Sequence, residues 1–177
     1  MQNLSVDLSV NQAYRSKRNA KDFINGDEQL QYGVLKDYAQ MINTVDKGSR
    51  VILQTEMVDE TSQPKFKRMY VRFNAQNVGF LGGCGPFIGL DGCHIKHRFC
   101  GQILSATTKD ENDNIFPVAM AVMEQETRES WIWFLEIFAN DRGRPEELKL
   151  VFIFDRQKIS SMEMSNCSMV SLRTMHT

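Results

Sequence analysis

The stretch from Phe87 to Asp155 changes its hydrophobic period twice, and this change restricts the fold more than any other feature of the chain. Three strand-like segments come first, at residues 87–95, 102–108 and 115–123. A segment with helical periodicity follows them, and the almost wholly apolar segment 148–154 comes last. An apolar run of this kind is typical of a central, parallel strand. The sequence therefore predicts a β-β-β-α-β unit within an α+β fold.

The helix of this unit is expected to begin at Thr127 or Ser130 and to end at Gly143. Four bulky residues fall on one of its faces and predict a buried stripe: Trp131, Phe134, Leu135 and Phe138. Trp133 and Ile137 lie on another face, so we expect the helix to be covered on two sides. Both tryptophans are therefore interpreted as core residues.

Helical periodicity also dominates the N-terminal region, residues 1–80. Asn11 is placed to cap a first helix, and Asp27 is placed to cap a second one. The second helix carries one apolar stripe: Val34, Leu35, Tyr38, Met41, Ile42 and Val45. A small β element is expected after it, because residues 51–57 and 69–73 alternate in polarity.

A glycine-rich segment is expected to break the chain between the N-terminal region and the β-β-β-α-β unit. It contains Gly79, Gly82, Gly83, Gly85 and Pro86. The second half is therefore placed at residues 81–158. Residues 159–177 are rich in Ser and Met and show neither helical nor strand periodicity. They are expected to be a disordered tail or a segment with a different coding history.

Two acidic residues lie at conspicuous positions in the predicted strands. Asp91 interrupts the apolar segment 87–95, and Asp155 ends the apolar segment 148–154. An ionised carboxylate inside a central strand is costly unless a cation compensates its charge. In a β-β-β-α-β order the first and fourth strands are expected side by side, which brings both carboxylates to one point.

Two converging carboxylates suit Mg²⁺ or Mn²⁺ and the two-metal chemistry of phosphoryl transfer. The alternative is that each aspartate only ends a strand or accepts backbone hydrogen bonds in a turn. The pattern of Asp91 and Asp155 leaves both interpretations open.

The net charge gives no indication of a nucleic-acid partner. The 177 residues contain 21 Lys and Arg against 22 Asp and Glu, so recognition of DNA would require a local patch. Two groups of cations are candidates: Arg15, Lys17, Arg18 and Lys21 on the first helix, and Arg156 and Lys158 beside Asp155. A charged helix face is more often simply solvated, so this interpretation also stays open.

No segment has the length and apolarity of a membrane span, and the N-terminus lacks the layout of a secretory signal. The four cysteines are therefore expected to be reduced in an intracellular compartment. Four residues after Asp91 have spacings that zinc could accept: Cys93, His94, His97 and Cys100. Because successive strand residues point to opposite faces, a packed strand with a polar end is favoured over zinc. No phosphate-cradling loop for a nucleotide is present.

Three sequence blocks in the second half resemble the transposase domain of plant Mutator-like elements (MULE), a family of the DDE superfamily. They are FIGLDGCHIK, GQILSATTKDENDNIFPVAMAVMEQETRESWIWFLE and FIFDRQK. The resemblance covers roughly residues 11–158. It implies an RNase H-like fold and a DDE triad that binds two Mg²⁺ or Mn²⁺ ions, cuts DNA at transposon ends and joins it elsewhere. Asp91 matches the first acid and Asp155 matches the second.

The third acid of the family is a Glu on a later helix, and no matching segment follows Asp155 before Thr177. The N-terminal zinc-type module and the C-terminal SWIM finger of the family are missing as well. The expectation is therefore an incomplete RNase H-like domain that does not transpose by itself. The alternatives are a domesticated module that binds DNA or protein through its helical half, and a remnant without function. DNA as partner and a nuclear location follow from the resemblance, and homo-oligomerisation is left open.

Overall fold

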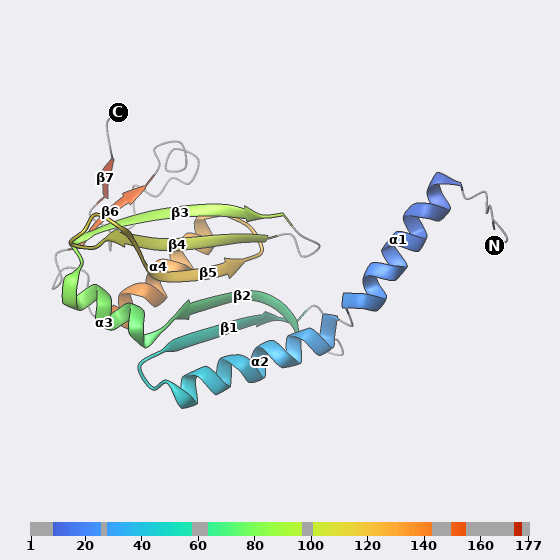
Figure 1. Cartoon of the computed structure of the whole chain (residues 1–177), viewed down its shortest axis with the longest axis horizontal. Coiled ribbons are helices and arrows are strands. Elements are labelled where there is room, and N and C mark those ends of the chain that lie inside the picture. The colour runs from blue at the N-terminus through green and yellow to red at the C-terminus, as the bar shows by residue number, and fades with distance from the viewer. Residues whose placement is uncertain are drawn as a thin grey trace, which may run out of the picture. The chain divides into compact units, whose positions relative to one another are not determined.

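The computed structural model describes residues 9–25, 28–57, 64–96, 101–142, 150–154 and 172–174. The chain divides into two compact units, Met1–Asp37 and Tyr38–Thr177. The first unit contains helix α1 (Val10–Asn25) and the beginning of helix α2 (Glu28–Val45). The second unit contains the end of α2 and all of the strands, so the candidate site lies there (Figure 1).

Both N-terminal helices form where the sequence predicts them, although the first cap differs. Ser9 rather than Asn11 caps α1. Its Oγ accepts a hydrogen bond from the backbone amide of Gln12 at 3.3 Å, and Gln12 Oε1 accepts one from the amide of Ser9 at 2.9 Å. This reciprocal pair is a capping box, which satisfies two helix-end donors at once.

The strands of the described residues form one mixed sheet in the order β1-β2-β5-β4-β3-β6-β7 (Figure 1). Their bounds are β1 Arg50–Glu56, β2 Lys65–Arg72, β3 Phe87–Ile95, β4 Gly101–Lys109, β5 Ile115–Met123, β6 Val151–Phe154 and β7 Leu172–Thr174. The pairs β1–β2, β2–β5, β5–β4 and β4–β3 are antiparallel, whereas β3–β6 and β6–β7 are parallel. With helix α4 (Arg128–Arg142), the predicted β-β-β-α-β unit is confirmed as β3-β4-β5-α4-β6.

The glycine-rich segment is not a simple break, because helix α3 (Asn74–Gly83) contains three of its glycines. Gly79 has a packing role, since a Cβ atom there would lie 2.6 Å from Cζ of Phe116 on β5. The predicted boundary between residues 80 and 81 lies inside this helix. Because β2 pairs with β5, the N-terminal β element extends the sheet of the second half.

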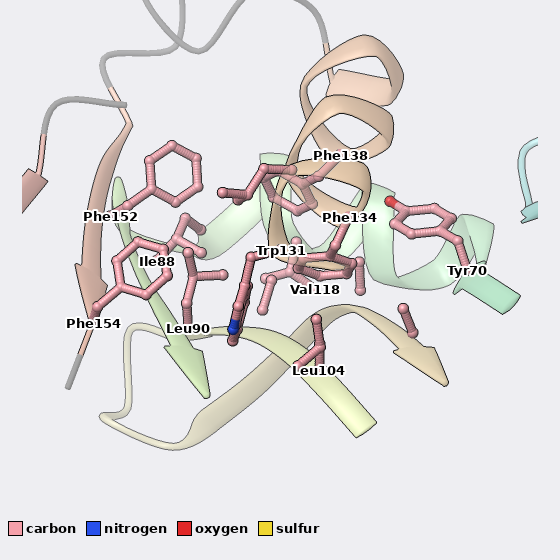
Figure 2. Close-up of a cluster of buried hydrophobic side chains, with 14 of the residues drawn as sticks. Tyr70, Ile88, Leu90, Leu104, Val118, Trp131, Phe134, Phe138, Phe152 and Phe154 are labelled. Carbon is pink, nitrogen blue, oxygen red and sulfur yellow. The ribbon is translucent and has the colours of Figure 1, made fainter. Parts of the chain in front are cut away.

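The main core lies between α4 and one face of the sheet, and the predicted buried stripe of α4 is confirmed (Figure 2). Trp131, Phe134, Leu135 and Phe138 are all buried there, with Phe134 and Phe138 fully so. The aromatic rings meet edge to face or tilted, with Trp131 and Phe154 centroids 5.5 Å apart. Trp133 is only partly buried, and the guanidinium of Arg68 lies 5.9 Å from its ring centroid.

A second, smaller core lies between the end of α2 and the opposite face of the sheet. It consists of Ala39, Ile42 and Val51, with Met69 and Val71 packed against it. Asn43 joins α2 to β1, because its side chain donates to the carbonyl of Val51 and accepts from its amide, both at 2.8 Å. The apolar stripe of α2 is only partly used, since four of its six members are exposed: Val34, Tyr38, Met41 and Val45.

The remaining strands agree with the predicted order and differ in detail. Pro117 lies where the β4–β5 register shifts and beyond the last β2–β5 pair, Val71↔Met120, so its missing amide removes no bond to β2. Burial alternates along β6, where Phe152 and Phe154 are buried and Val151 and Ile153 are half-buried. β7 lies in the segment 159–177, where the sequence indicates no regular structure.

Candidate functional site

Asp91 lies in the middle of β3 with its side chain exposed. The backbone amide of Gly92 donates to its Oδ1 at 2.8 Å, and the hydroxyl of Ser105 on β4 donates to its backbone carbonyl at 3.3 Å. The cost expected for a carboxylate inside a central strand therefore does not apply to Asp91. The neighbours Ile88 and Leu90 are buried, so the apolar character of β3 comes from the other face of the strand.

The strand register shows which face of the sheet carries Asp91. Cross-strand partners run in one row through Asp91, Ser105, Met120, Val71 and Val51. Directly opposed residues in neighbouring strands point to the same face. Val71 and Val51 pack on the core formed with α2, so Asp91 projects from the face that α2 covers at its β1–β2 edge. This is the face opposite α4.

The backbone beside Asp91 is held from behind by the segment that precedes α4. A Cβ atom at Gly92 would lie 2.8 Å from Cδ of Glu126, so the carboxylate of Glu126 lies directly against this glycine. Glu126 Oε1 in turn accepts a hydrogen bond from Nε1 of Trp131 at 3.3 Å. The core tryptophan of α4 is therefore linked to the strand position next to Asp91.

The second predicted acid follows a strand that the structure places next to β3. The last described pair of the parallel β3–β6 ladder is Leu90↔Phe154. Asp91 is the next residue of β3, and Asp155 follows Phe154 in the sequence. Asp155 lies outside the described residues, as do Arg156 and Lys158.

The predicted cationic residues of the first helix are not part of this site's unit. Arg15, Lys17 and Arg18 lie on α1 with exposed side chains, and α1 belongs to Met1–Asp37. Lys21 also lies on α1, but its side chain is outside the described part. Exposure leaves these cations accessible to an anionic partner.

The zinc interpretation gains no support from the residues that can be placed. Cys93 is exposed, and Nδ1 of His94 lies 3.1 Å from Nε2 of Gln102. His97 and Cys100 are outside the described residues. Within the described ranges, no three His, Cys, Asp or Glu side chains gather as a metal site.

The carboxylate of Asp91 is chemically suited to bind a hard divalent cation. A carboxylate oxygen is the ligand type that Mg²⁺ and Mn²⁺ prefer, and both ions retain water molecules when few protein ligands are present. The exposed position of Asp91 lets a hydrated ion approach it. A single described carboxylate accounts for only part of such a site.

Sequence reasoning missed two buried arginines on β2, which face α4 on either side of Tyr70. Arg72 binds the buried Asp141 at the end of α4 through Nε and Nη2, the latter 2.7 Å from Oδ1. Tyr70 donates to Oδ2 of Asp141 at 3.1 Å. The hydrogen bond to Asp141 raises the pKa of Arg72 above its usual value, against the opposing effect of burial.

Arg68, the second buried arginine, lies at the other end of β2 and pairs with two glutamates. Its Nη2 lies 2.6 Å from Oε1 of Glu124 and 3.0 Å from Oε1 of Glu129. Burial raises the pKa of Glu124, but the hydrogen bond and charge of Arg68 outweigh it, and that pKa lies below its usual value. The only sequence signal was the alternation of Arg68, Tyr70 and Arg72, which fits a covered strand face as well as an exposed one.

One comparison with known proteins found a match. Residues 87–167 match the family model of the MULE transposase domain, slightly less than half of the chain. The match begins at the first residue of β3 and continues past β6. No curated protein and no solved structure matches the chain. None of the described helices is long and apolar enough to cross a membrane. The family match indicates a transposase-like function and, in general terms, interaction with DNA.

Proposed function

We propose that residues 87–167 are part of a metal-dependent DNA transposase of the DDE superfamily, of the kind found in plant Mutator-like elements. In this proposal the sheet belongs to an RNase H-like domain, and Asp91 and Asp155 are its first two catalytic acids. The chain acts on DNA, and its location is nuclear for that reason. The activity of the transposase to which these residues would belong is the cleavage of DNA at transposon ends and strand transfer.

One observation carries this proposal, namely the parallel pairing of β3 with β6 inside the family-matched region. In a parallel ladder, partners at the same register present their side chains to the same face. A ladder that pairs Leu90 with Phe154 supports a shared position for Asp91 and Asp155 one step further along. The two acids are 64 positions apart in the sequence, and the chain between them includes helix α4.

The proposed role of Asp91 rests on its place in the sheet. A rigid strand fixes the carboxylate of Asp91, and the hydrogen bond from the amide of Gly92 restricts its rotation. Arg156 and Lys158 follow Asp155 directly and are proposed to hold the DNA phosphates that pass the site. The divalent ions, when bound, would activate the attacking oxygen and stabilise the leaving one.

We expect Asp91→Asn to weaken Mn²⁺ binding by roughly tenfold or more, because it removes the charge of one ligand and keeps its shape. Isothermal titration of the 177-residue chain with MnCl₂ measures this directly. Asp113→Asn is the matched control, since Asp113 is exposed in the β4–β5 turn and its positive φ of 64° suits asparagine. Equal heats from wild type and Asp91→Asn would refute the metal site.

A second candidate function is favoured by the exposed cations of α1. Here the chain is a domesticated, non-catalytic module that binds DNA or protein through its helical half, with Arg15, Lys17, Arg18 and Lys21 on phosphates. A gel shift with duplex DNA separates the two functions. Binding that survives Asp91→Asn and chelation, and is lost when these four residues become glutamine, supports the second function. Binding that needs Asp91 and the metal supports the first.

A further inference from the structure

A polar pocket of about 370 Å³ lies at the edge of the second unit, away from Asp91. It is formed where the turn between α2 and β1 meets the end of β2 and the end of α4. Its charged lining residues are Lys47, Arg50, Arg72 and Asp141. The turn itself is rigid, because Ser49 Oγ accepts a hydrogen bond from the amide of Asn74 at 2.8 Å and donates one to Asp46.

The lining of this pocket carries more positive than negative charge. Asp141 is its only lining carboxylate, and that group is already engaged by Arg72 and Tyr70. Arg50 has only a distant contact with it, at 3.9 Å from Nε to Oδ1. Three cations against this one carboxylate leave the described lining with an excess of two positive charges.

Arg72 also carries an unsatisfied donor. Its Nη1 atom is buried and has no hydrogen-bond partner among the described residues, while Nε and Nη2 both bind Asp141. Buried polar atoms in folded proteins are almost always paired with protein, water or an ion. Arg72 Nη1 therefore leaves a donor for an acceptor from outside the described residues, and the neighbouring charges of Lys47 and Arg50 favour an anion over water.

We propose that this pocket binds a phosphate group. A tetrahedral phosphate presents several acceptor oxygens and negative charge, which match the fork of Arg72 and the charges of Lys47 and Arg50. Because Nη1 is buried, an oxygen reaches it only when a lining side chain moves, and the half-exposed Arg50 has that freedom. The phosphate belongs either to a DNA backbone or to a free, small phosphate compound.

This site stands independently of the proposed metal site. Asp91 lies three strands away in the sheet, and none of the pocket residues shares its row of cross-strand partners except Val51. If the phosphate is that of DNA, the pocket adds a positioning contact to the transposase function. If it is free phosphate, the pocket is a separate ligand site.

The first experiment titrates the ¹⁵N-labelled chain with inorganic phosphate and follows the backbone amides by NMR. Shifts are expected at Gly48, Ser49 and Arg50, and the double variant Lys47→Gln/Arg50→Gln should bind roughly tenfold more weakly. Both side chains are exposed, so the variant should retain the fold. The control is Lys65→Gln/Arg128→Gln, which removes two exposed cations elsewhere and should leave the affinity unchanged.

The second experiment identifies the source of the phosphate by measuring duplex DNA binding at several salt concentrations. If the DNA backbone occupies the pocket, Lys47→Gln/Arg50→Gln weakens DNA binding and reduces the salt slope by about 1 for one lost phosphate contact. If DNA binding is unchanged while phosphate binding is lost, the ligand is a free phosphate compound. Phosphate shifts that are absent, or equal in the variant and wild type, overturn the proposal. Mn²⁺ titration of the same variant should match wild type, which keeps the two sites distinguishable.

Discussion

Asp141→Ala is expected to lower the free energy of unfolding by about 3–5 kcal/mol, because it leaves Arg72 as a buried charge without a counter-ion. The side chains of Arg72 and Asp141 are only 6% and 4% exposed, so water screens the charge of Arg72 poorly once the carboxylate is lost. The change also removes the acceptor for the hydroxyl of Tyr70, which is itself fully buried. Urea unfolding followed by far-UV circular dichroism measures the effect.

The control for Asp141→Ala is an ion pair in the opposite environment. Lys109 and Asp113 form an exposed i,i+4 pair at 2.9 Å, and Lys109→Gln should change stability by at most about 0.5 kcal/mol. The double variant Arg72→Met/Asp141→Leu should recover most of the loss, since apolar side chains of similar size replace both charges. If Asp141→Ala lowers the free energy of unfolding no more than Lys109→Gln does, the buried charge of Arg72 does not need Asp141 as a counter-ion.

The buried ion pair of Arg72 and Asp141 is an example of a contact that the sequence could not predict, whereas other parts of the fold could be predicted. The β3–β6 neighbourhood followed from local periodicity and the connection rules for parallel strands. The buried face of α4 followed from the spacing of Trp131, Phe134 and Phe138. Arg72 and Asp141 are 69 residues apart, and nothing in either local pattern connects them. Pairings of that kind depend on tertiary packing, which periodicity does not encode.

Two other differences have the same physical origin. The glycines of the segment before β3 indicated a break, yet α3 forms there, and Gly79 lets this helix approach Phe116 closely. The apolar neighbours of Asp91 suggested a costly position for a carboxylate, whereas alternation puts Asp91 on the exposed face, opposite Leu90. The sequence showed that the glycine-rich segment and the position of Asp91 are unusual. The structure that each adopts depends on the elements that pack against it.

Trp131→Ala should be the most destabilising change in the main core, with an expected loss of about 3–5 kcal/mol. Trp131 is 1% exposed, contacts Phe134 and Phe154 edge to face, and donates a hydrogen bond to Glu126. Its removal leaves a large cavity and takes one hydrogen-bond donor away from the carboxylate of Glu126, which lies next to Gly92. Trp131→Phe should lose less, because a ring still fills much of the volume. Urea unfolding curves of the three proteins give these differences.

Trp133 on the same helix is the matched control, because it is only partly buried and stacks against Arg68 at the surface of the core. Trp133→Ala should lose roughly 1–2 kcal/mol. Equal losses from the two alanine variants would contradict the assignment of Trp131 as the central core residue. Trp131 also packs on Phe154, the residue before Asp155, and through Glu126 reaches the backbone beside Asp91. On the proposed function, Trp131→Phe should weaken Mn²⁺ binding while the chain stays folded, because Trp131 contacts Phe154 of β6 and donates to Glu126, which lies against Gly92 of β3.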